Sequence, residues 1–161
     1  MSVAERQSEE LQETVVKIKP VSKATKGGRK RSFSALVVVG NRNGKVGLGF
    51  GKANEVPAAI EKGIKDAKKS MIDVALRGNT IPHSVTGRYG AAQVFLKPAS
   101  TGTGVIAGAT VRAIVEAAGI RDILTKSRGT TNPVNLVKAA FDGLRSLRGK
   151  KQIELLRGVK I

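Results

Sequence analysis

The chain has 161 residues, of which 40% are hydrophobic, and its 29 Lys and Arg outnumber its 12 Asp and Glu. This length and apolar content are enough for one domain or two small ones, which excludes a disordered basic tail, and the formal charge of +17 favours a polyanionic partner such as a nucleic acid. The absence of Cys and the single His exclude disulfides, Cys-based chemistry and a His-rich metal cluster.

Residues 1–10 are polar and lack an apolar period, which predicts a flexible tail. The acidic start has no apolar core of the kind found in signal peptides, and no stretch approaches the roughly 20 apolar residues of a transmembrane helix. We therefore expect a soluble, unexported protein with no membrane partner.

The segment that follows is strongly basic, because residues 14–54 hold ten Lys or Arg and no Asp or Glu. Residues 15–20 read as a strand, and residues 21–31 are predicted to form a mobile loop because they have almost nothing apolar to bury. Gly27 and Gly28 permit a tight reversal or a close approach of the backbone to a ligand. Solvated surfaces generally mix charges, so a loop of one sign predicts a polyanion-binding site.

Residues 33–39 are rich in β-branched side chains, and Asn43-Gly44 predicts a hairpin to a second strand over residues 45–50. Glycines at 47, 49 and 51 give that strand one bare face that something can approach closely, which we interpret as a second contact surface for a partner, without a catalytic role. Asn54 is expected to cap the next helix. Its predicted buried stripe comprises Val56, Ile60, Ile64, Ala67 and Met71. Residues 71–76 are compatible with a short closing strand.

These elements predict a two-layer α+β domain over residues 11–74, followed by a linker at residues 75–80. A second hairpin is predicted over residues 81–88 and 92–97, then a helix that ends at Gly119 and a strand over residues 120–125. Asn132-Pro133 is typical of a helix start. The second half is therefore predicted as a ββαβα domain over residues 81–148, with a basic tail at residues 149–161.

Two glycine motifs and one histidine suggest enzymatic alternatives. The sequence GLGFGKA at residues 47–53 lacks the spacing of a phosphate-binding loop. Residues 102–107 match G-x-G-x-x-A, with Asp122 where a ribose-binding acid would lie, but too little chain follows for a doubly wound sheet. His83 has no carboxylate or nucleophile nearby in sequence. We expect no catalytic residue, metal, cofactor or small-molecule substrate.

The few aromatic residues bear on the kind of nucleic acid. Phe33, Phe50, Phe95 and Phe141 lie at periodic positions typical of a core, so base stacking on single strands is not expected. Recognition of a folded or duplex RNA through its backbone fits better, because the sequence holds no basic recognition helix or zinc finger that would favour DNA. A free-standing duplex-RNA regulator and a small nucleotide-dependent enzyme remain the alternatives.

Long collinear blocks add a family resemblance. They are KGGR at residues 26–29, FSALVVVGNRNGKVGLGFGKANEVPAAI at 33–60, PASTGTGVIAG at 98–108 and RAIVEAAGIRDILTKSRGTTNP at 112–133. Across residues 11–147 the chain resembles the family of bacterial small-subunit ribosomal protein five. Two small departures are Asn41, where Asp is frequent in the family, and Thr130, where Ser is frequent.

The resemblance implies a double-stranded-RNA-binding-like domain of three strands and a helix, and a C-terminal domain that is not catalytic. It also implies a cytoplasmic structural constituent of the small ribosomal subunit, at the head–body junction near the messenger RNA path, that supports assembly and translational accuracy. Residues 21–29 would insert into ribosomal RNA (rRNA) near the spectinomycin site. Gly104 and Arg112 would face ribosomal protein four, and ribosomal protein eight is the other implied neighbour.

Charge and resemblance together give a candidate set for rRNA binding. The set combines the basic loop with three cations of the following hairpin. It comprises Val21, Ser22, Lys23, Lys26, Gly27, Gly28, Arg29, Lys30, Arg31, Arg42, Lys45 and Lys52.

Overall fold

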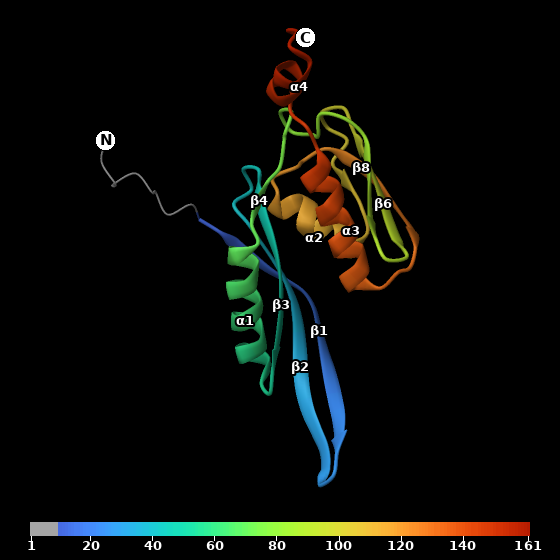
Figure 1. The fold of residues 1–161 in the computed structure, drawn as a ribbon. Helices are drawn as coiled ribbons and strands as arrows, with labels where there is room; N and C mark the ends of the chain where they lie inside the picture. The colour runs from blue at the N-terminus through green and yellow to red at the C-terminus, as the bar shows by residue number, and fades with distance from the viewer. Residues whose placement is uncertain (1–9) are drawn as a thin grey trace, which may run out of the picture.

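The structure is a computed structural model that describes residues 10–161, so the predicted tail lies outside the described residues except for Glu10. The first of its two sheets has the order β1 (Gln12–Thr25), β2 (Gly28–Gly40), β3 (Lys45–Ala53) and β4 (Ile72–Asp73), all antiparallel (Figure 1). Helix α1 (Val56–Lys69) covers one face of this sheet.

The second sheet has the order β5 (Val85–Tyr89), β6 (Ala92–Pro98), β8 (Ile123–Gly129) and β7 (Val105–Ile106). Helices α2 (Ala109–Ala117) and α3 (Pro133–Ser146) pack on it. The side chain of Asn132 caps α3 as predicted, accepting from the Val134 backbone N–H at 3.2 Å. Strand β7 was not predicted, because two residues show no alternation, and β8 begins three residues later than expected. The predicted α+β class is confirmed.

The glycine face of β3 lies beneath α1. A Cβ atom at Gly49 would overlap the carbonyl oxygen of Gly63, and one at Gly51 would overlap that of Ala59. Helix and strand are therefore in backbone contact along this face. The prediction that the bare face is open to a further partner is wrong, because the fold itself uses it.

This close contact also changes which side of α1 is buried. Its buried residues are Ala59, Gly63 and Ala67, because only small side chains fit between the helix and the glycines. Four members of the predicted stripe, Val56, Ile60, Ile64 and Met71, are half-buried at its sides. The predicted cap is also wrong. Glu55 is the N-cap residue, without a side-chain hydrogen bond to the helix, while the Asn54 amide oxygen accepts from the Ser32 hydroxyl at 3.4 Å.

The two sheets share one hydrophobic cluster, which joins Leu36, Val38 and Val46 of the first sheet to the buried residues of the second. The β2–β3 turn also docks on the end of α2. The backbone N–H of Arg42 donates to the carbonyl of Ala117 at 3.0 Å, and that of Gly44 to the carbonyl of Ala118 at 2.9 Å. The two sheets are thus packed and hydrogen-bonded to each other. The predicted domain boundaries at residues 74 and 81 stay a prediction.

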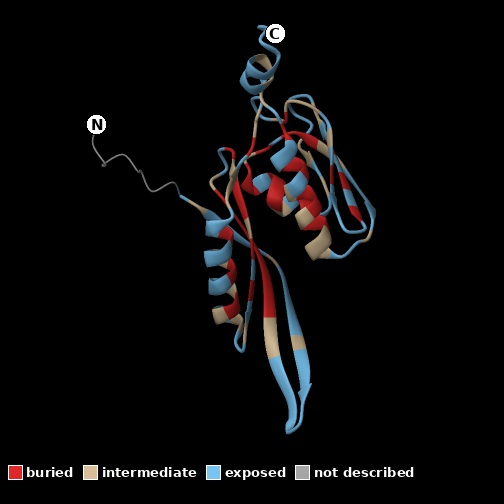
Figure 2. Ribbon diagram, in the orientation of Figure 1, coloured by how far each residue is buried: buried red, intermediate tan, exposed pale blue. Residues whose placement is uncertain are grey.

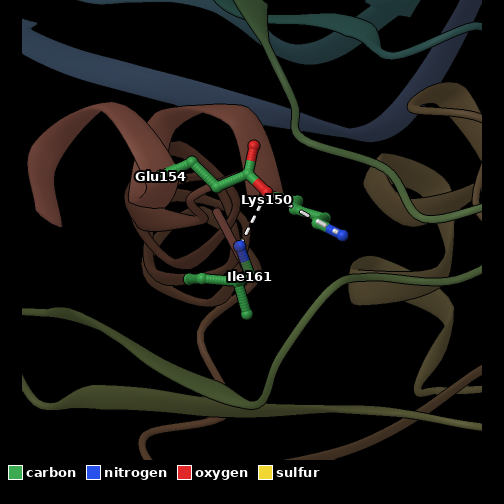
Figure 3. Close-up of polar contacts among 3 residues, drawn as sticks. All are labelled: Lys150, Glu154 and Ile161. Atoms are coloured by element: carbon green, nitrogen blue, oxygen red, sulfur yellow. Dashed lines mark hydrogen bonds and ion pairs between the residues drawn. The ribbon is translucent and has the colours of Figure 1, made fainter. Parts of the chain in front are cut away.

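The predicted basic tail contains a helix, α4 (Lys150–Arg157), which has no buried residue. Glu154 ties it to the end of the chain, as Figure 3 shows: its carboxylate pairs with Lys150 at 3.8 Å and accepts from the Ile161 backbone N–H at 3.0 Å. Among residues 10–161, no helix has the length and apolar content to span a membrane.

Replacing Gly49 with Ala tests the contact between α1 and β3. Because the added methyl group would meet backbone atoms of α1, we expect the free energy of unfolding in urea to fall by about 1–3 kcal/mol. Gly27→Ala is the matched control, since a Cβ atom there meets nothing within 4 Å. Equal stability of the two variants would contradict the close packing.

Candidate nucleic-acid interface

Strands β1 and β2 continue beyond the end of β3. Strand β3 pairs with β2 from Gly40 back to Phe33, whereas residues 21–25 and 28–32 pair only with each other. We call residues 21–31 the basic arm. It projects from the sheet as a two-stranded ribbon whose residues are exposed, except for the half-buried Val21 (Figures 1 and 2).

The arm corrects the prediction that residues 21–31 form a loop, while their mobility in the free protein stays a prediction. Thr25 pairs with Gly28, so the turn itself consists of Lys26 and Gly27 alone. Gly28 has φ +136°, a conformation that side-chain-bearing residues rarely adopt, and its carbonyl accepts from the Thr25 hydroxyl at 2.9 Å. The polar sequence did not predict this ribbon, because strand prediction relies on alternating apolar residues, and an exposed hairpin does not need them.

Strand alternation distributes the cations of the arm over both of its faces. Lys23 and Lys30 are directly opposed across the ribbon, on the face that continues to Leu36. Arg29 and Arg31 lie on the other face, which continues toward α1. Directly opposed like charges destabilise a strand pair, and residues 21–31 contain no carboxylate to offset them. The arm therefore favours an anion on either face.

The base of the arm carries further cations and an aromatic ring. Lys19 and Lys52 both pair with Ser34, one from each side of β2. Phe50 lies near them with 48% of its surface exposed.

The prediction that Phe50 and Phe95 are core residues is wrong, since Phe50 is 48% exposed and Phe95 is 38% exposed. Alternation identifies the face of a strand but not whether another element covers that face.

The structure separates the other two hairpin cations from the arm. Arg42, at φ 55°, lies in the β2–β3 turn, and Lys45 begins β3 opposite Asp73. These residues are at the far end of β2, roughly 30 Å along the strand from Arg31. The predicted rRNA-binding set thus falls into two places: the arm with Lys52, and the distant turn.

Gly104 and Arg112 lie close to β7. Gly104 immediately precedes the strand with φ +76°, and the Arg112 guanidinium donates to the carbonyls of Val105 at 3.2 Å and Ala107 at 3.5 Å. The two predicted interface residues are therefore brought together around one edge strand.

Asp122 explains the adjacent glycine motif. Its buried carboxylate accepts from the backbone N–H of Gly104 at 2.9 Å and of Gly102 at 3.2 Å. The protein's own side chain thus occupies the amides that a nucleotide phosphate would need. This arrangement disfavours the nucleotide-dependent alternative.

His83 also has a structural explanation. Its Nε2 accepts from the backbone N–H of Arg148 at 3.2 Å, and its Nδ1 lies 3.0 Å from the carbonyl of Ser84, to which it can donate. Both ring nitrogens are therefore engaged by the main chain. Within residues 10–161, no group of three or more His, Asp or Glu is arranged to hold a metal ion.

Two family models match most of the chain, one over each sheet. Residues 11–75 match the family model described as Ribosomal protein S5, N-terminal domain, and residues 87–157 match Ribosomal protein S5, C-terminal domain. The second match extends into α4, beyond the resemblance noted in the sequence.

Three curated relatives are each named Small ribosomal subunit protein uS5. The protein of Rubrobacter xylanophilus is 60% identical over 152 residues, which are 94% of this chain and 76% of the relative. The protein of Syntrophobacter fumaroxidans is 59% identical, with coverage of 94% and 92%, and that of Thermotoga neapolitana is 54% identical, with coverage of 98% and 88%. Both sheets and nearly the full length of the chain are accounted for, and the chain therefore belongs to the ribosomal protein S5 family.

Proposed function

We propose that the protein is a structural constituent of the small ribosomal subunit and that its basic arm binds rRNA. The names of the relatives support the ribosomal role. The single observation that supports RNA binding most strongly is the arm: a projecting ribbon with five Lys or Arg, no Asp or Glu, and no fully buried residue.

Electrostatics explains why such a ribbon should be more stable on RNA than alone. The opposed ammonium groups of Lys23 and Lys30 repel each other in the free protein, and phosphates between or beside them would remove that repulsion. Because Arg29 and Arg31 lie on the opposite face, the arm can contact RNA segments on both sides. It therefore suits a crevice where rRNA segments converge.

The tip of the arm suits a close approach to the RNA backbone. Gly27 has no unusual φ, and a Cβ atom there would meet nothing within 4 Å, so the fold itself does not require glycine at this position. A bare main chain instead leaves room for a phosphate or sugar. Gly28, by contrast, is needed for the turn.

The rest of the chain gives the arm a fixed base. Contact between α1 and β3 and the cluster shared by the two sheets hold the strands from which it extends. Lys52 adds a cation at this base, and Arg42 and Lys45 would form a second, separate rRNA contact. The mechanism that follows is bracing: two packed sheets hold a cationic ribbon at constant reach during subunit assembly.

Family resemblance extends the proposal to the setting in the cytoplasmic ribosome. We place the protein at the junction of head and body, near the messenger RNA path, with ribosomal proteins four and eight as neighbours. The proximity of Gly104 and Arg112 at β7 supports one continuous surface toward protein four. Through that surface the protein would influence translational accuracy.

Removing three cations of the arm tests its contact with RNA. In the variant Lys23→Ala, Lys26→Ala, Arg29→Ala, we expect weaker binding to small-subunit rRNA because fewer counterions are released. The slope of log affinity against log salt should fall by roughly two to three units, at about 0.7–0.9 per phosphate contact. Filter binding over a salt series measures both quantities.

The matched control removes the same charge elsewhere, as Lys65→Ala, Lys69→Ala, Lys151→Ala, all exposed positions on α1 and α4. Its slope should stay close to that of the parent. An unchanged slope in the arm variant, or an equal loss in the control, would contradict the assignment of the arm.

Cosedimentation tests the ribosomal role separately from the arm. Tagged full-length protein in cell lysate should comigrate with small ribosomal subunits in a high-salt sucrose gradient, because a structural constituent stays bound where loosely associated factors dissociate. A ribonuclease-treated lysate is the control and should release it. Protein that remains at the top of the untreated gradient would instead indicate a free-standing RNA regulator.

A further inference from the structure

The second sheet has an outer face, directed away from the helices, that is separate from the basic arm. Its inner face packs on the helices, where Gly87, Val94 and Leu96 are buried. Because side chains alternate along a strand, every second residue of β5, β6 and β8 points away from the helices. These residues include Thr86 and Arg88 of β5, Gln93 and Phe95 of β6, and Lys126 and Arg128 of β8, all exposed.

Cross-strand pairing arranges these six side chains in two rows. Arg88 pairs with Gln93, which pairs with Arg128; in the next row Thr86 pairs with Phe95, which pairs with Lys126. Neighbouring strands lie about 4.8 Å apart, so the two arginines are roughly 10 Å apart with the Phe95 row about 7 Å away. The six side chains thus form one patch, in which an aromatic ring lies among cations.

The charge of this outer face is of one sign. Strands β5, β6 and β8 contain Arg88, Lys97, Lys126 and Arg128 but no Asp or Glu, and no ion pair is found for these four within residues 10–161. The carboxylate of Asp142 reaches β5 from α3, but it accepts from the backbone N–H of Arg88 at 3.3 Å. The cations of the face therefore favour an anionic partner.

Phe95 indicates which anion. It is 38% exposed on a central strand, between a threonine and a lysine. An acidic protein would satisfy the cations, but the carboxylates that pair with them would gain nothing from an aromatic ring between a threonine and a lysine. A base stacked on the ring with phosphates on the cations uses both features, and only unpaired bases can stack in this way.

We propose that the outer face of the second sheet binds a single-stranded RNA segment. Phe95 stacks on one base, and Arg88, Lys126 and Arg128 contact the phosphates on either side. This site is independent of the arm, which has no aromatic residue and presents its cations on a projecting ribbon.

The test uses the full chain with the substitutions Lys23→Ala, Lys26→Ala and Arg29→Ala in the arm. In this background, RNA binding by the arm does not mask RNA binding by the outer face. Fluorescence anisotropy measures binding of a labelled oligouridylate of about ten nucleotides and of an RNA duplex of equal length. In this background Phe95→Thr should weaken oligouridylate binding about 5- to 100-fold without changing the salt slope, because stacking carries no charge. Duplex binding should change much less.

Arg88→Gln with Arg128→Gln should lower the oligouridylate salt slope by about 1.4, at roughly 0.7 per contact. Lys151→Gln with Lys160→Gln is the control of equal charge and should leave the slope nearly unchanged. If Phe95→Thr unfolds at a lower urea concentration than the parent, Phe95→Leu replaces it, since leucine keeps the apolar bulk but not the aromatic face. Parent-like oligouridylate binding by the folded Phe95 variant, or an equal effect of the control pair, would overturn the proposal.

Discussion

Strand β2 is buried on both of its faces, and this burial holds α1, the second sheet and the basic arm in place. All residues from Ser34 to Gly40 are buried: alternate side chains pack under α1 and in the cluster shared with the second sheet. A two-stranded ribbon alone is marginally stable in water. The arm can therefore extend as a paired ribbon only because the same strand is held on both faces before it leaves the core.

This division of β2 separates two tasks along one strand. The buried half supplies the hydrophobic stabilisation, while the exposed half carries cations that contribute nothing to the core and repel one another. Stability in one half thus supports an unfavourable charge arrangement in the other, which RNA would relieve. The second sheet shows the same separation across its thickness, with an apolar face toward the helices and a cationic face toward solvent.

Features with a local physical signal could be predicted from sequence. The β-branched run 33–39 and the Asn132-Pro133 helix start are confirmed. Features that depend on which element packs against a segment could not be predicted from sequence. The arm lacks apolar alternation, the glycines of β3 indicate close approach without naming α1 as the partner, and two-residue β7 has no pattern. The exposure of Phe50 and Phe95 likewise depends on where neighbouring elements end. For the candidate site, charge identified the arm, whereas the separation of Arg42 and Lys45 from it required the fold.

We propose that the tip of the basic arm lies within rRNA in the assembled subunit. Because the chain has no cysteine, a single Lys26→Cys substitution provides a unique attachment point for tethered Fe(II)-EDTA. Hydroxyl-radical cleavage mapped in reconstituted small subunits should give strong cuts at a few converging rRNA segments from position 26. Cleavage from Lys65→Cys on α1 should be weaker and lie elsewhere. Absence of rRNA cuts from position 26 in subunits that contain the protein would show that the tip of the arm does not lie within rRNA.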